Sequence, residues 1–112
     1  MIPVTPPALV EVDSSRRYVS VNESACNLLG YTRQELLNLR IDDVSFPSGA
    51  HVAPMFKQYV RKGEMRGIFA LQRKNGEVLR VRFESETGAG GLTAAWTHYE
   101  VWKNPEYARL RE

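Results

Sequence analysis

The chain has only one cysteine, Cys26, among its 112 residues. A single cysteine cannot form an internal disulfide, and it cannot build a cysteine-based zinc site. Long apolar runs are also missing, since none approaches the roughly 20 residues that a membrane-spanning helix needs. The first residues lack the basic start and the apolar stretch of a secretory signal. We therefore expect a cytoplasmic domain without a membrane span.

A large excess of charge of one sign is absent as well. The chain has 15 Lys plus Arg and 13 Asp plus Glu, which leaves a formal net charge of +2. This balance is too small to indicate a nucleic-acid-binding surface. The sequence also contains no phosphate-binding loop, no zinc-binding motif and no nucleophile elbow. We therefore predict no nucleic-acid partner, no metal site and no catalytic residues.

What is present is the composition of an ordinary globular domain, with 43% apolar and 25% charged residues. The length fits one domain that buries about 65% of the surface exposed by its unfolded chain. Prolines in the first seven residues predict an N-terminal linker over residues 1–7. We place the folded domain at 8–102 and the start of a C-terminal linker helix at 103–112, where Asn104 and Pro105 supply a cap and a first helical residue.

The front half of the domain carries clear local signals. Residues 8–13 and 17–21 alternate in polarity, which predicts two paired strands. Asn22 can then cap a helix by accepting a hydrogen bond from an amide of its first turn, and Gly30 suits the left-handed residue at its end. Thr32 and Glu35 form a capping box for a second helix. Apolar residues at helical spacing anchor the two helices: Ala25, Leu28, Leu29, Leu36 and Leu37.

The back half is predicted to hold one longer helix and three strands. Pro54 is tolerated at the first position of a helix but not in its middle, so we place the helix at 54–62. Asn75 and Gly76 form a turn that is typical of a tight hairpin. The strands are predicted at 66–73, 78–86 and 92–101.

This order of elements resembles the PAS domain family over nearly the whole chain. The resemblance is carried by Asn22, Ala25, Leu29, Gly30, Tyr31, Glu35, Leu36, Leu37 and the Lys74-Asn75-Gly76 turn. It implies an α+β PAS fold, in which a five-stranded antiparallel sheet has short helices and one longer helix packed on one face. It also implies a sensory or signalling module, which is usually not an enzyme. Asn38, where the family often has Gly, and residues 98–100, where it often has Asp-Ile-Thr, depart from the pattern.

Alternation along the strands predicts which side chains point inward, because successive strand residues face opposite sides of a sheet. In PAS domains the helices close a pocket over that inner face. We predict a ligand pocket lined by Leu29, Leu37, Phe56, Tyr59, Phe69, Leu71, Val81, Phe83 and Trp96. Trp96 would either fill the core or form a wall on which a planar ligand stacks. The hydroxyl of Tyr59 would need a hydrogen-bond partner if it is buried.

The opposite face of the sheet is predicted to be more apolar than a solvated surface needs to be. Apolar patches of this kind commonly mark interfaces. We predict a homodimer that forms through this outer face or through the terminal helix. The predicted interface residues are Ile68, Ala70, Val78, Ala95, Thr97 and Tyr99.

The resemblance also bears on cofactors, and we predict none. PAS relatives that form a photoreactive flavin adduct keep its cysteine in a middle helix, whereas Cys26 lies in an earlier one, where we expect a small buried hydrophobe. Haem-binding relatives use a His early in the long helix. His51 lies slightly before that place, so we expect an exposed loop residue, and haem ligation is the less favoured alternative.

Three functions remain open on the sequence. The leading hypothesis is a sensory PAS domain that binds a small ligand in an apolar pocket and acts on a fused output domain in a longer chain. The second is a ligand-free module for protein–protein interaction. The third is a small acid–base enzyme that uses Asp42, Asp43, Tyr31 and Tyr59, although nothing in the sequence places a nucleophile beside a base.

Overall fold

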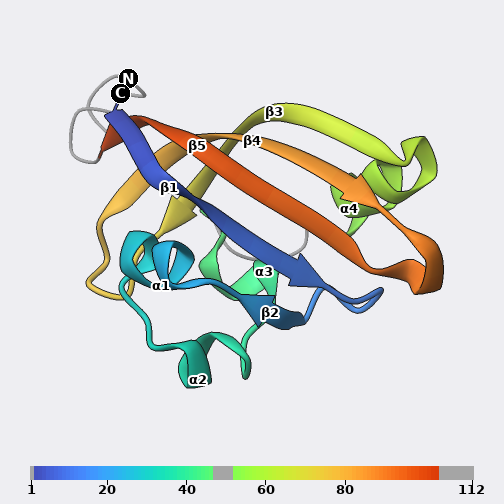
Figure 1. Ribbon diagram of the computed structural model, residues 1–112, viewed down its shortest axis with the longest axis horizontal. Coiled ribbons are helices and arrows are strands. Elements are labelled where there is room, and N and C mark those ends of the chain that lie inside the picture. The colour runs from blue at the N-terminus through green and yellow to red at the C-terminus, as the bar shows by residue number, and fades with distance from the viewer. Residues whose placement is uncertain (1, 47–51, 104–112) are drawn as a thin grey trace.

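Five antiparallel strands form a single sheet in the computed structural model, which describes residues 2–46 and 52–103 (Figure 1). Along the chain they are β1 (Ile2–Val12), β2 (Tyr18–Val21), β3 (Glu64–Gln72), β4 (Val78–Thr87) and β5 (Thr93–Lys103). The order across the sheet is β2-β1-β5-β4-β3. The first strand therefore lies beside the last one, and β5 is the central strand.

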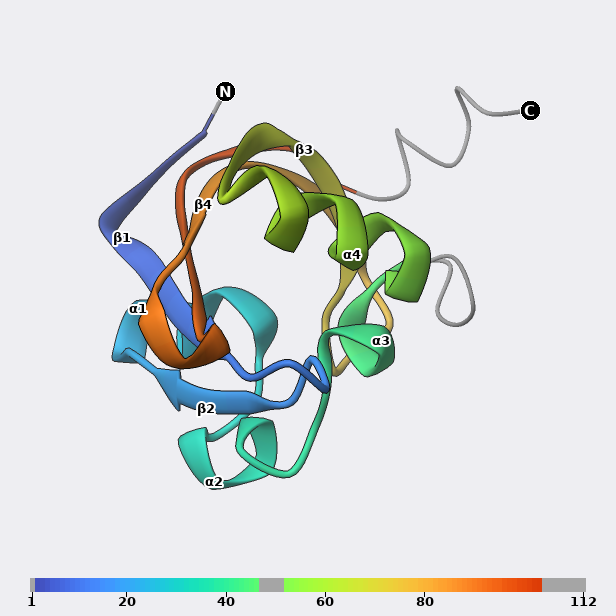
Figure 2. The same cartoon turned by 90° about the vertical axis from the view of Figure 1, so that its right-hand side faces the viewer.

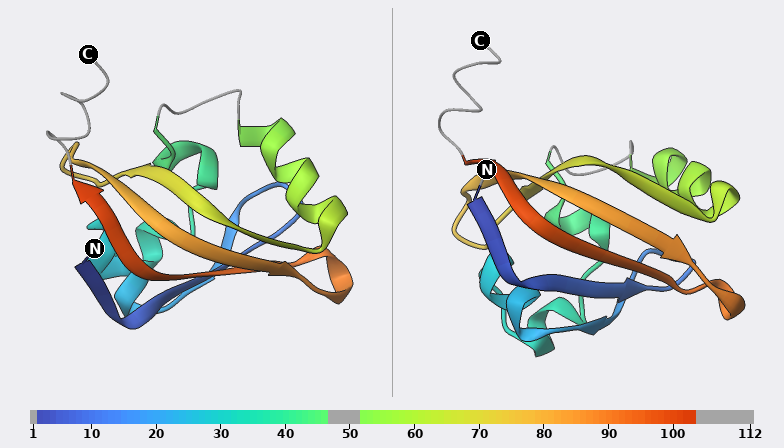
Figure 3. Two further views of the ribbon diagram at one scale, coloured as in Figure 1. Left: turned by 90° about the horizontal axis from the view of Figure 1, so that it is seen from above. Right: turned by 45° about the horizontal axis from the view of Figure 1, so that its top comes forward.

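The helices connect the front strands to the back strands. They are α1 (Glu23–Leu29), α2 (Arg33–Leu36), α3 (Ile41–Val44) and α4 (Val52–Lys62), and a short 3₁₀ helix, η1 (Ala89–Gly91), lies between β4 and β5. Figures 2 and 3 show α1, α3 and α4 on the inner side of the curved sheet. The predicted fold class is confirmed: the protein is α+β, with short helices and one longer helix on one face of a five-stranded antiparallel sheet.

The predicted caps of the first two helices are confirmed. The side chain of Asn22 accepts a hydrogen bond from the amide of Ala25, and Gly30 ends α1 in the left-handed conformation with a φ of 80°. Thr32 and Glu35 form both bonds of the capping box at the start of α2. These capping hydrogen bonds pair backbone groups that a helix leaves without partners at its ends.

Two element boundaries differ from their predicted positions. β1 begins at Ile2, because Ile2 and Pro3 pair with Glu100 and Tyr99 of β5, so the residues predicted as a linker extend the first strand. α4 begins at Val52, which makes Pro54 its third residue. A proline is tolerated there because the first four amides of a helix have no acceptor within it.

Asp42 and Asp43 lie in the short helix α3, where the carboxylate of Asp43 caps the helix by accepting a hydrogen bond from the amide of Arg40 at 2.8 Å. One further segment differs from the sequence prediction. β5 continues to Lys103, the first residue of the predicted linker helix. The remainder of that predicted helix lies outside the described residues.

The core lies between the inner face of the sheet and the helices. Its least exposed side chains include Leu36 and Val44 from the helices and Leu79 and Val81 from β4. Cys26, half-buried, packs against this cluster from α1. Burial of such side chains is the main favourable term in folding, and it fixes the positions of the strands that surround the site.

A candidate ligand cavity

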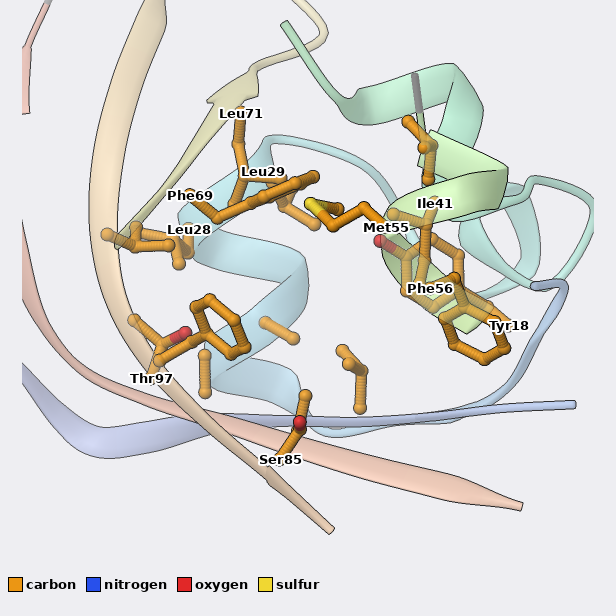
Figure 4. Close-up of a pocket in the computed structure, with 17 residues that line it drawn as sticks. Tyr18, Leu28, Leu29, Ile41, Met55, Phe56, Phe69, Leu71, Ser85 and Thr97 are labelled. Atoms are coloured by element: carbon orange, nitrogen blue, oxygen red, sulfur yellow. The ribbon is translucent and has the colours of Figure 1, made fainter. Parts of the chain in front are cut away.

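A cavity of about 110 Å³ lies between the sheet and the helices (Figure 4). All five strands and the helices α1, α3 and α4 contribute side chains to it. The lining residues are Ala8, Val10, Tyr18, Ala25, Leu28, Leu29, Ile41, Val52, Met55, Phe56, Phe69, Leu71, Val81, Phe83, Ser85, Ala95 and Thr97. Segments from both ends of the chain therefore meet around one space.

The lining is apolar except for three hydroxyl groups. They belong to Tyr18 on β2, Ser85 on β4 and Thr97 on β5, and Figure 4 shows their oxygens among walls of carbon. All three residues are buried, with 4%, 6% and 8% of their surface exposed. Burial raises the pKa of the Tyr18 phenol, and the negative charges of Asp43 and Asp42 raise it further. The Tyr18 hydroxyl is therefore protonated at neutral pH.

Six of the nine predicted pocket residues line the cavity: Leu29, Phe56, Phe69, Leu71, Val81 and Phe83. The rings of Phe69 and Phe83 meet edge to face, with centroids 6.3 Å apart. Aromatic pairs favour this arrangement because the positive edge of one ring meets the negative face of the other. The faces of β3 and β4 that carry these side chains therefore line the cavity.

Two predicted pocket residues lie elsewhere. Leu37 is 36% exposed, whereas its neighbour Leu36 is fully buried. Leu37 is the C-cap residue that follows α2, whereas Leu36 is the last residue of the helix itself. Trp96 lies on the outer face, where its indole N–H donates a hydrogen bond of 2.7 Å to the carboxylate of Glu84. The side chain of Tyr59, the ninth predicted residue, is outside the described part of the structure.

The face of β5 is therefore the reverse of the predicted one. Trp96 pairs with Glu84 across the sheet, and Glu84 alternates with Phe83 and Ser85, which both face the cavity. The predicted interface residues Ala95 and Thr97 consequently line the cavity instead. Small side chains on the central strand leave the space that the large residues of neighbouring strands surround.

The other predicted interface residues have mixed positions. Ile68 is 44% exposed and Ala70 is half-buried, both on the outer face of β3. Val78 is buried, with 4% of its surface exposed, so it is not available to a partner in this structure. The side chain of Tyr99 lies outside the described residues. The six predicted interface residues therefore do not form one apolar patch.

Sequence reasoning missed nine residues that line the cavity: Ala8, Val10, Tyr18, Ala25, Leu28, Ile41, Val52, Met55 and Ser85. Some of them had a usable signal, because Ala8 and Val10 alternate along β1, and Ser85 continues the inward face of Val81 and Phe83. Tyr18 and Ile41 had none, since their approach to the cavity depends on how β2 and α3 pack.

Lys74 fixes the β3–β4 turn to the helices beside the cavity. Its amide donates a hydrogen bond to the carbonyl of Leu29 at 3.0 Å, and its ammonium group lies 2.6 Å from the carboxylate of Glu35. The same ammonium group lies 6.0 Å from the centre of the Tyr31 ring. The hydrogen bond from Lys74 lowers the pKa of Glu35, together with the amide of Thr32. The turn, α1 and α2 are thus held together by contacts distant in sequence.

A family model described as a PAS domain matches residues 6–87. This match spans more than half of the 112 residues. The chain belongs to the PAS domain family. No curated protein sequence matches it significantly.

Solved PAS domains have the same fold at low sequence identity. A domain of a sensory box sensor histidine kinase/response regulator from Geobacter sulfurreducens is 22% identical, with a TM-score of 0.74 over 83% of this chain and 82% of that chain. The PAS domain of an HTR-like protein from Haloarcula marismortui is 17% identical, with a TM-score of 0.72 over 87% and 83%. The PAS domain of a LuxR-family transcriptional regulator from Burkholderia thailandensis, in complex with ethanol, is 15% identical, with a TM-score of 0.70 over 89% and 93%.

The cavity of this PAS domain is small. At about 110 Å³ it is well below the roughly 300 Å³ at which pockets for drug-sized ligands begin, and a flavin or haem ring system is of that larger class. Among the described residues, its lining contains no Asn, Gln or His. His51 lies outside the described residues, and Cys26 does not line the cavity. Within residues 2–46 and 52–103 no group of three metal-binding side chains is found.

The acidic residues considered for acid–base chemistry have other partners. Asp42 forms a two-point ion pair with Arg16, at 2.8 and 3.1 Å, and Asp43 caps α3. The hydrogen bond from Arg16 lowers the pKa of Asp42. Neither carboxylate lines the cavity. In the described part of the chain, no helix is long and apolar enough to cross a membrane.

Proposed function

We propose that this PAS domain is a cytoplasmic sensory module that binds a small molecule in its cavity and acts on an output domain fused to it in a longer chain. The observation that carries the proposal is the apolar cavity with three buried hydroxyl groups. Similar folds in a sensor histidine kinase and in a transcriptional regulator, the latter in complex with ethanol, support the same role. The non-enzymatic role expected from the sequence belongs to this proposal.

The signal would travel through the elements that border the cavity. A ligand would contact Met55 and Phe56 on α4, and Ala95 and Thr97 on the central strand. A molecule that fits one arrangement of helix and sheet better than another shifts the population toward that arrangement. Because β5 is the central strand and pairs with both β1 and β4, a shift of β5 would be transmitted to both halves of the sheet.

Filling the cavity tests this proposal. Ala95→Leu places a larger side chain in the space, whereas Ala94→Leu makes the same change at the neighbouring position, which faces the other side of β5. We expect the wild-type protein and Ala94→Leu to release the same small molecule on denaturation, as detected by mass spectrometry. We expect Ala95→Leu to release none while keeping its circular dichroism spectrum. Equal release from all three proteins would contradict the proposal.

A second candidate function is self-association through the outer face of the sheet. Along β4 the outward residues are Arg80 and Arg82, followed by Glu84 and Glu86. They share a face because alternate strand residues point the same way. A two-fold axis between Arg82 and Glu84 would bring each arginine opposite a glutamate of a second copy. Interfaces with two-fold symmetry require this kind of self-complementary pattern.

Exposed apolar side chains flank these charges. Ile68 is 44% exposed and pairs with Arg82, while Leu9 is 43% exposed and pairs with Trp96. The outer face therefore combines apolar contacts with a charge order that a second copy of the chain can match. The order of charges along β4, and not the apolar patch predicted from the sequence, is what supports a homodimer.

Charge reversal at one end of the row tests self-association. Glu86→Lys would place like charges opposite each other in the dimer, and Arg80→Glu combined with it would restore opposite charges. We expect sedimentation velocity to show dissociation for Glu86→Lys and recovery for the double variant. Glu23→Lys is the control, since it makes the same charge change at an exposed position of α1. A wild-type monomer at high concentration would contradict this candidate.

A further inference from the structure

We infer that the ligand of the cavity is a compact uncharged molecule, with an apolar body no larger than a six-membered ring and one oxygen that bonds Ser85 and Thr97. The inference rests on the function proposed above and specifies its ligand. It follows from three features of the cavity: the absence of charged groups in its lining, its volume, and the placement of its hydroxyl groups.

The residues that line the cavity disfavour a charged ligand. Among the 17 lining residues that the structure describes, none is Asp, Glu, Lys, Arg or His. A buried ion without a charged partner is strongly unfavourable, because the interior does not replace its hydration. Two acids reinforce this for anions: the charges of Asp43 and Asp42 act on the hydroxyl of Tyr18 and help to raise its pKa. A carboxylate ligand would meet the same negative potential.

Size is limited by the volume of about 110 Å³. For comparison, an engineered cavity of about 150 Å³ lined by Leu, Ile and Phe binds benzene. The present cavity is smaller, but Met55 lines it from α4, and an unbranched methionine side chain adjusts readily to what it packs against. A single ring or a branched alkyl group of similar size therefore fits, whereas a fused ring system does not.

Two hydroxyl groups on adjacent strands indicate where the polar group of the ligand would bind. Phe83 pairs with Thr97 and Ser85 pairs with Ala95, so Ser85 and Thr97 are diagonal neighbours on the cavity side of the sheet. Diagonal neighbours lie about 7–8 Å apart, which leaves room for one atom between two side chains. No hydrogen bond joins either hydroxyl to another of the described residues. Each hydroxyl can donate and accept a hydrogen bond, so a ligand oxygen that does both would bond the pair.

Four probes of similar shape test the inference: phenol, benzene, benzoate and benzylammonium. Binding is measured by titration of the folded protein, followed through methyl NMR signals of Leu29, Val81 and Ala95. We expect phenol to bind more tightly than benzene, and the two ions to leave these signals unchanged. In Ser85→Ala/Thr97→Val we expect about a tenfold loss of phenol affinity, with the affinity for benzene retained. Retained benzene binding also shows that the double variant folds.

Ser20→Ala removes an exposed serine hydroxyl from β2 and serves as the matched control. Phenol should bind this control as it binds the wild-type protein. Binding of benzoate or benzylammonium as tight as that of phenol would overturn the inference while supporting a ligand site. An unchanged preference for phenol in the double variant would also overturn it. If none of the four probes moved the methyl signals, the proposed ligand site itself would be contradicted.

Discussion

Asn22 joins three parts of the backbone through one side chain. Its Oδ1 accepts hydrogen bonds from the amides of Ala25 and Leu9, at 2.9 and 3.0 Å, and its Nδ2 donates one to the carbonyl of Pro7 at 3.0 Å. The sequence identified only the first of these bonds, because a helix cap is a local feature. The other two connect the start of α1 to β1, which forms one wall of the cavity.

Asn22→Ala is expected to lower the free energy of unfolding by about 2–3 kcal/mol. Loss of a helix cap alone costs about 1 kcal/mol, and the bonds to β1 add a similar amount. Urea unfolding followed by circular dichroism measures the change. Asn38→Ala is the control, because Asn38 is exposed and its side chain bonds only the nearby carbonyl of Gln34. Equal losses for the two variants would show that the bonds to β1 contribute nothing.

The ion pair between Arg16 and Asp42 gives a prediction about pH. The pKa of Asp42 is lower in the folded protein than in the unfolded chain, chiefly because Arg16 donates hydrogen bonds to it. The pair therefore stabilises the fold fully above the unfolded pKa of about 4. The stabilisation is lost as the pH falls through the lower folded pKa.

Asp42→Asn is thus expected to lower the free energy of unfolding by about 1 kcal/mol at pH 7, since partly exposed ion pairs contribute modestly. The difference between wild type and variant should shrink as the pH falls below 4. Urea unfolding at several pH values between about 3 and 7, which covers the titration of a carboxylate, measures this difference. A difference that stays constant over this range would show that the carboxylate charge is not what matters.

At the scale of elements, α1 ends where the β3–β4 turn meets it. Gly30 holds a φ of 80°, and a Cβ at this position would lie 3.8 Å from the Cβ of Lys74, an ordinary contact. The requirement for glycine therefore comes from the backbone angle and not from crowding. A left-handed conformation costs an ordinary residue about 1–2 kcal/mol.

Gly30→Ala is expected to lower the free energy of unfolding by about 1–2 kcal/mol. Gly88→Ala is the matched control, because Gly88 has a φ of −102° and no atom within 4 Å of a built Cβ. Alanine there should be neutral or slightly stabilising, since it restricts the unfolded chain. Thermal unfolding of both variants measures the contrast. If Gly88→Ala were the more damaging change, the assignment of Gly30 as the helix end would be wrong.

The strands show what the sequence could determine about the site. On β4, Val81 and Phe83 alternate with Arg80 and Arg82, so only one face can be buried. On β5, Thr93, Ala95 and Thr97 alternate with Ala94 and Trp96, and both sets are compatible with burial. Size then favours the wrong set, because Trp96 is the largest apolar residue. Only the pairing of Trp96 with Glu84 determines the face, and that is a tertiary contact.

At the scale of the whole molecule, the cavity is formed by residues that are far apart in the sequence. Ala8 and Thr97 line the same space because β1 pairs with β5. The family pattern predicted the order of elements, and hence the sheet. It could not predict which small residues leave a space beneath the helices, because that depends on the register of the central strand. The register shifts twice between β4 and β5.

The pairing of β1 with β5 also determines how the domain responds to tension. Ile2 lies opposite Glu100, so the start of the first strand and the far part of the last strand meet at one end of the sheet (Figure 1). Antiparallel strands are joined by hydrogen bonds perpendicular to their length. A force that pulls Ile2 and Lys103 apart would therefore load these bonds one after another, and the two strands would unzip.

Optical-tweezers experiments can compare two attachment geometries. Handles at Ile2 and Lys103 should open the domain at low force, with β1 separating from β5 first. Handles at Val12 and Lys103 should require a clearly higher force, because Val12 lies opposite Thr93 at the other end and the bonds are then sheared together. Similar forces for both geometries would rule out unzipping. A polypeptide under tension would thus open this domain at the seam between its first and last strands, along one wall of the cavity.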